Sequence, residues 1–119
     1  MKKEIKGILI NVHDRSVKAV VLKHHGEDHV GLKEMHELIG CDCFTCVDFD
    51  HCEGPITNSV YVDDEGLLKD PKEFFMIPGY HQWLAGNGLI LGVDESGESV
   101  DTTLTVEQVE QVIKFGRIK

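Results

Sequence analysis

Apolar positions dominate the segment from Ile5 to Val12, as in a strand that is largely buried. The polar segment 11–16 (NVHDRS) supplies turn-forming residues that end this strand. The following segment, 16–22 (SVKAVVL), is rich in β-branched residues, which favour strands. We therefore predict an antiparallel hairpin at the beginning of the chain.

Three further segments have strand-like patterns. Residues 41–49 (CDCFTCVDF) alternate with a period of two, and residues 59–62 form a short strand. Residues 85–93 form the clearest buried strand of the second half, and a short return strand passes through Val100. The turn 94–97 (DESG) separates those two strands.

Two segments lack a regular period. Residues 50–58 (DHCEGPITN) contain Gly and Pro and are predicted to form a loop. Residues 67–80 are predicted to be irregular, with one helical turn after Pro71.

Two segments show helical spacing. Between His29 and Ile39 apolar residues recur three and four positions apart, Asp28 is placed to cap this helix and Gly40 to end it. Near the C-terminus, Thr105 and Gln108 have the spacing of a capping box. The predicted inward stripe of this second helix, and the glycine predicted to stop it, are Val106, Val109, Val112, Ile113 and Gly116.

These elements predict one α+β domain spanning residues 1–119. A chain of 119 residues has the usual size of a single domain and buries roughly two thirds of its unfolded surface. The expected architecture is a mostly antiparallel sheet of about five strands, with two short helices packed on it. We find neither an internal repeat nor a linker.

The charge pattern narrows the range of partners. The chain carries a formal charge of −9, and residues 60–101 hold nine acidic side chains against two lysines. Because such a field repels phosphate backbones, we expect no direct binding to nucleic acid. No apolar run approaches the roughly twenty residues of a membrane span, so we expect no membrane insertion and a cytoplasmic location in a bacterial host.

The cysteines invite a metal interpretation, because all four and His51 fall within positions 41–52. Zinc sites commonly contain a Cys-x2-Cys pair on a turn. Cys43 and Cys46 have this spacing, but they lie in a strand pattern that directs them to opposite faces. We therefore interpret the cysteines as small buried hydrophobic residues. A zinc site formed by Cys41, Cys43, Cys46 and Cys52 is the alternative.

The segment 79–88 (GYHQWLAGNG) is the main candidate for a binding site. It mixes large aromatic rings with side-chain donors and acceptors, as ligand pockets and protein interfaces do. Its glycines come before a strand, whereas phosphate-binding glycine loops follow a strand and open a helix. We instead expect positive φ or close backbone approach at Gly86 and Gly88, with Asn87 as a turn former.

The order and spacing of several segments resemble the domain-of-unknown-function family DUF3846, which occurs in phages, plasmids and bacteria. The segments that carry the resemblance are Tyr61–Leu67, Phe74–Phe75, Gly79–Tyr80, Leu84–Gly92 and Asp94–Glu98. The likeness covers most of the chain. The family has no established activity that the resemblance could assign to this chain. Its occurrence in phages and plasmids suggests a protein that acts by binding.

Three functions are open at this point. The first is a non-enzymatic phage or plasmid protein, without a cofactor, that binds a small nucleotide-like ligand or signal in counter-defence or regulation. Its predicted ligand-binding residues are Tyr80, His81, Gln82, Trp83 and Asn87. The second is an acidic, DNA-mimicking inhibitor that binds a host protein through Asp63, Asp64, Glu65, Asp94, Glu95 and Glu98. The third is the zinc-stabilised module, and a homodimer or higher homo-oligomer is compatible with each.

Overall fold

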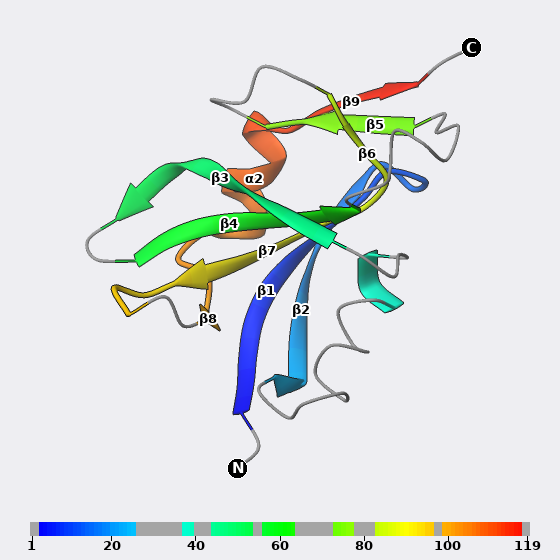
Figure 1. Ribbon diagram of the computed structural model, residues 1–119. Helices are drawn as coiled ribbons and strands as arrows, with labels where there is room; N and C mark the ends of the chain where they lie inside the picture. The colour runs from blue at the N-terminus through cyan, green and yellow to red at the C-terminus, as the bar shows by residue number, and fades with distance from the viewer. Residues whose placement is uncertain are drawn as a thin grey trace.

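Two antiparallel sheets and one short helix enclose the main hydrophobic core (Figure 1). The computed structural model describes residues 3–25, 37–39, 44–53, 56–63, 73–77, 83–96 and 99–117. Within this part of the chain, no helix is long and apolar enough to cross a membrane.

The large sheet contains six strands. Its main path, in spatial order, is β2 (Ser16–His25), β1 (Lys3–Asn11), β7 (Gly88–Val93), β4 (Ile56–Asp63) and β3 (Phe44–Glu53). The short strand β8 (Ser99–Val100) pairs with β7. Asn11 lies opposite Ser16, which confirms the predicted N-terminal hairpin. The predicted return strand through Val100 is confirmed as well.

The small sheet was not predicted. Its order is β6 (Leu84–Ala85), β5 (Glu73–Met76) and β9 (Lys114–Arg117). Among the described residues there are thus nine strands in two sheets, so the expectation of about five strands was too low. A period of two cannot be recognised in strands of two to four residues, because they offer too few alternations. The α+β class itself is confirmed.

Three predicted boundaries were wrong. The strand expected over 85–93 is divided, because Gly86 adopts a φ of +81° between β6 and β7. Residues 73–76, expected to be irregular, form β5. The loop expected over 50–58 is mostly strand, because β3 continues through Glu53 and β4 begins at Ile56.

The predicted capping box starts α2 (Val106–Val112). The Thr105 hydroxyl accepts the Gln108 N–H at 3.1 Å, and the Gln108 side chain accepts the Thr105 N–H at 2.8 Å. The helix ends at Ile113, which has extended backbone angles, and Gly116 belongs to β9 rather than acting as the stop. Val109 and Ile113 are buried as predicted, whereas Val112 is exposed.

The other predicted helix falls largely outside the described residues. Residues 37–39 are helical, as expected for its last turn, and Ile39 is buried. Residues 26–36, together with Gly40, are not described.

The large sheet is covered on both faces. On one face, Ile8, Ile10 and Val60 pack with α2 and with Phe75 of the small sheet. The opposite face carries Leu22, Leu89 and Leu91, which form a second cluster with Ile39. Burial on both faces explains why β7 reads as a continuous apolar run rather than an alternating one.

Candidate functional site

Trp83 lies on the outer face of the small sheet. Phe75 in the middle of β5 is fully buried in the core, and strand residues alternate between faces, so Phe74 and Met76 belong to the outer face. Leu84 lies opposite Phe75 and is also buried, which places Trp83, one residue earlier, on the outer face. The Trp83 side chain is 42% exposed.

A glycine of β9 accommodates the Trp83 ring. A Cβ atom added to Gly116 would lie 3.0 Å from Cζ3 and 3.2 Å from Cη2 of the indole. Gly116 lies opposite Phe74, so the indole extends across the outer face of β5 towards β9. The ring is therefore packed against backbone while part of it remains accessible, which is a suitable arrangement for stacking on a flat ligand.

The Asn87 side chain makes hydrogen bonds within the fold, and its role in ligand binding stays a prediction. Its Oδ1 accepts the Val12 N–H at 3.1 Å, and its Nδ2 donates to the Leu38 carbonyl at 3.4 Å. The side chain thus joins the turn after β1 to the helical residues 37–39. The other predicted ligand-binding residues, Tyr80, His81 and Gln82, lie outside the described residues. Among the described residues predicted to bind a ligand, Trp83 is the one that is exposed.

The described residues of the two acidic turns include Asp63 and Asp94, which lie far apart on the large sheet. Asp63 ends β4, whereas Asp94 follows β7, and Thr57 near the start of β4 lies opposite Val93. Asp63 and Asp94 therefore lie at opposite ends of β4, about 20 Å apart at the usual rise per strand residue. Asp94 accepts the Ser96 N–H at 2.9 Å and the Ser96 hydroxyl at 2.7 Å, which stabilises its own turn. Glu95 is exposed.

The remaining acidic candidates, Asp64, Glu65 and Glu98, lie outside the described residues. The register of β4 with β7 keeps Asp63 and Asp94 apart, so these two acids do not share one end of the sheet. The protein partner itself stays a prediction.

The cysteine candidates are placed only in part. Cys46 lies on β3 opposite Tyr61 and is exposed, so the interpretation as a buried hydrophobic residue is wrong at this position. Cys41 and Cys43 lie outside the described residues, as does the side chain of Cys52. In the part of the chain that the structure describes, no three His, Cys, Asp or Glu side chains are close enough to hold a metal ion.

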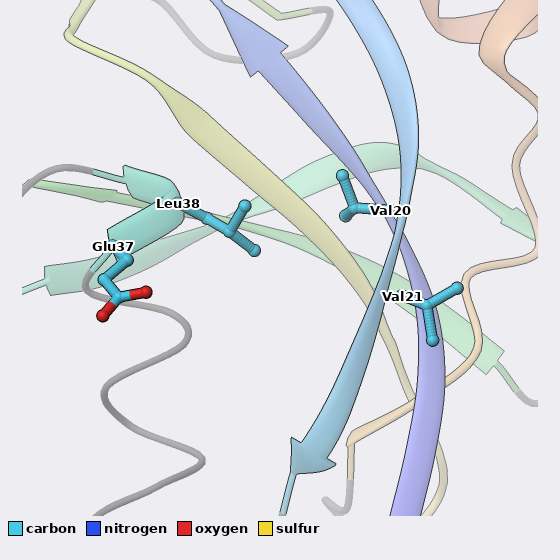
Figure 2. A pocket seen from close by; sticks show the side chains of 4 residues that line it. All are labelled: Val20, Val21, Glu37 and Leu38. Atoms are coloured by element: carbon cyan, nitrogen blue, oxygen red, sulfur yellow. The ribbon is translucent and has the colours of Figure 1, made fainter.

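Sequence reasoning missed a hollow beside β2, which is shown in Figure 2. Its volume is about 380 Å³, and the described residues that line it are Val20, Val21, Glu37 and Leu38. Leu38 extends towards Val20 across the gap, whereas the Glu37 carboxylate points away from both valines (Figure 2). The described lining of the hollow is thus mainly apolar, and the Glu37 carboxylate does not point towards its valines.

The buried Asn58 was also missed, because it was predicted to belong to a loop. It is fully buried on β4, donates from Nδ2 to Thr103 Oγ1 at 2.9 Å and accepts from Thr102 Oγ1 at 2.5 Å. The Thr102 N–H in turn donates to the Lys6 carbonyl at 3.0 Å. This network holds the segment that leads into α2 against the large sheet, so we assign Asn58 to the fold rather than to a site.

Fold and surface together define a small α+β domain with one exposed tryptophan on a three-stranded sheet. The family model described as "Domain of unknown function (DUF3846)" matches residues 5–115, so the chain belongs to this family. Comparison with curated proteins gave no match. Comparison with solved structures also gave none.

Proposed function

We propose that this protein is a non-catalytic binding protein in which Trp83 stacks against a small, flat, nucleotide-like ligand. The observation that carries the proposal is the partly exposed indole, which is held over Gly116 on the outer face of the small sheet. Stacking of a base on an aromatic side chain contributes about 1–3 kcal/mol and tolerates different bases. A ring that already lies against backbone loses little conformational freedom on binding.

Intrinsic fluorescence provides a direct test, because Trp83 is the single tryptophan of the chain. Titration with the common nucleosides and nucleotides is expected to quench or shift its emission in a saturable manner, since a stacked base changes the surroundings of the indole. A flat response to the whole panel would count against the proposal.

Substitution at the ring tests the same proposal independently of fluorescence. Trp83→Ala is expected to weaken binding about 5- to 150-fold in calorimetry, which is the loss of one stacking interaction. Trp83→Phe should retain part of the affinity. Val112→Ala is the matched control, because Val112 is also a large, exposed apolar side chain but lies on α2, outside the small sheet.

Gly116→Val provides a third variant that leaves the indole in the chain. Its added Cβ would lie 3.0 Å from Cζ3 of the indole, so the ring must shift by a few tenths of an ångström. We expect altered Trp83 emission and weaker binding, while circular dichroism reports whether the fold is retained.

The proposal extends to a biological role. Through the association of the family with phages and plasmids, we propose that the bound ligand is a small signal which the protein sequesters in counter-defence or regulation. A sequestering protein releases its ligand chemically unchanged. Chromatography of the ligand after long incubation tests this point, and the appearance of a product would show an enzyme instead.

A further inference from the structure

We infer that the ligand held by Trp83 is an anion and that Lys114 provides the positive charge which selects it. This inference rests on the function proposed above. It adds the ligand's charge and names the side chain that recognises it.

The register of the small sheet places Lys114 on the same face as Trp83. Lys114 lies opposite Met76, and Gly116 lies opposite Phe74. Directly opposed residues of an antiparallel pair project from the same face, so Lys114 and Gly116 share the outer face with Met76 and Phe74. The Trp83 ring extends over Gly116, two residues from Lys114 along β9.

The distance between these positions suits one small ligand. Two residues along a strand correspond to about 7 Å. The long, flexible side chain of lysine allows its ammonium group to reach a charge next to a stacked ring. Lys114 is exposed, so contact with a ligand does not require the surrounding structure to open.

The local charge favours an anion although the whole chain is acidic. Lys114 is the basic residue that the described part of β9 places on this face, because Arg117 lies opposite Glu73 and belongs to the other face. The acidic residue of β5, Glu73, alternates with Phe74 and therefore belongs to the other face of that strand. Its Oε1 lies 3.1 Å from His13 Nδ1, which directs it to the β1–β2 turn. The described part of β5 and β9 therefore presents Lys114, and no carboxylate, on the Trp83 face.

This arrangement predicts a ligand that has a flat ring and a negatively charged group attached to it. A nucleoside 5′-monophosphate combines both, whereas a nucleoside has the ring alone. Salt bridges to phosphate are short-range and charge-assisted, so they distinguish the two compounds even though both can stack.

The test compares each of the four nucleosides with its 5′-monophosphate, using Trp83 emission and calorimetry on the full chain. We expect the monophosphates to bind about tenfold more tightly, because hydrogen bonds to charged groups contribute that much. This preference should decrease as salt is added.

Two lysine variants assign the preference to a residue. Lys114→Met should remove the preference for monophosphates while leaving nucleoside binding unchanged, and Lys114→Arg should retain it. The matched control is Lys18→Met, which removes an equally charged, exposed lysine from β2 in the large sheet and should leave the preference intact.

The outcomes separate the inference from the proposal on which it rests. Equal affinity for nucleosides and monophosphates would overturn the inference and leave stacking on Trp83 standing. A preference that survives Lys114→Met would overturn the assignment to Lys114. Absence of binding to both classes of compound would overturn the proposed function and the inference together.

Discussion

Gly86 and Gly88 are two positions apart and are required for different physical reasons. Gly86 has a φ of +81° with open space where a side chain would lie, so glycine is needed there for the backbone conformation. At Gly88 an added Cβ would lie 2.6 Å from Phe75 Cζ and 3.1 Å from Val60 Cγ1, so glycine is needed there because a side chain would clash with the core. Both expectations were available from the sequence, because a Gly-Asn-Gly segment before an apolar run marks a turn and a close approach.

Alanine substitutions distinguish the two reasons. Gly88→Ala should lower the free energy of unfolding by about 1–3 kcal/mol through overpacking. Gly86→Ala should lower it by about 1–2 kcal/mol through the left-handed backbone conformation. In urea unfolding, Phe75→Leu should couple energetically to Gly88→Ala and not to Gly86→Ala. Equal coupling to both would contradict this explanation.

Asn58 could not be recognised as a core residue from the sequence. Its hydrogen-bond partners, Thr102 and Thr103, lie 44 and 45 residues away, and asparagine next to Gly and Pro usually indicates a loop. Long-range polar contacts of this kind leave no local pattern.

Substitution of Asn58 should be strongly destabilising. Asn58→Ala removes the side-chain hydrogen bonds to Thr102 and Thr103 and leaves part-buried partners unsatisfied, so we expect a loss of about 2–3 kcal/mol in chemical denaturation. Thr57→Ala, at the exposed neighbouring position, is the control and should change stability by less than about 0.5 kcal/mol. A small effect of Asn58→Ala would show that the segment 101–105 is held by other contacts.

At the scale of elements, local signals were sufficient for the N-terminal hairpin and for the start of α2. The hairpin is short-range in sequence, and the capping box acts within four residues. The strands β5, β6 and β9 were missed because their pairing is set by residues far away, such as Phe75 opposite Phe115. This miss also explains why the proposed role of Lys114 was not predicted, since its place on the Trp83 face follows from the pairing of β9 with β5.

Removal of the capping box tests the contribution of α2. Thr105→Ala should reduce stability by about 1 kcal/mol, because it leaves the Gln108 N–H without its side-chain acceptor. Glu110→Ala, at an exposed position inside the same helix, should have little effect. Thermal unfolding followed by circular dichroism measures both. An equal loss in the two variants would contradict a specific contribution of the cap.

At the scale of the whole molecule, the fold depends on contacts between distant segments. Ile8 of β1 lies opposite Ile90 of β7, and Glu73 of β5 lies opposite Arg117 of β9. The composition and pattern were enough to predict an α+β domain, but they could not give the strand order, because many orders satisfy the same alternation of faces.

This topology predicts slow folding. Sheets made from distant strands fold in milliseconds to seconds, since the entropy of closing long loops is lost before the pairing is gained. Stopped-flow refolding from urea, followed by Trp83 emission, should therefore show relaxation in this time range. Complete refolding within the dead time of the mixing would contradict this expectation.

The pairing of β9 with β5 has a consequence during protein synthesis. The ribosome produces Trp83, β5 and β6 before it produces Gly116, the residue against which the indole packs. A nascent chain that ends at Ile113 already contains the complete sequence of the large sheet, yet it lacks the surface that supports the ring. We therefore expect a released chain that ends at Ile113 to show a more solvent-like Trp83 emission than the full chain, and the proposed ligand-binding surface to form only when β9 is present.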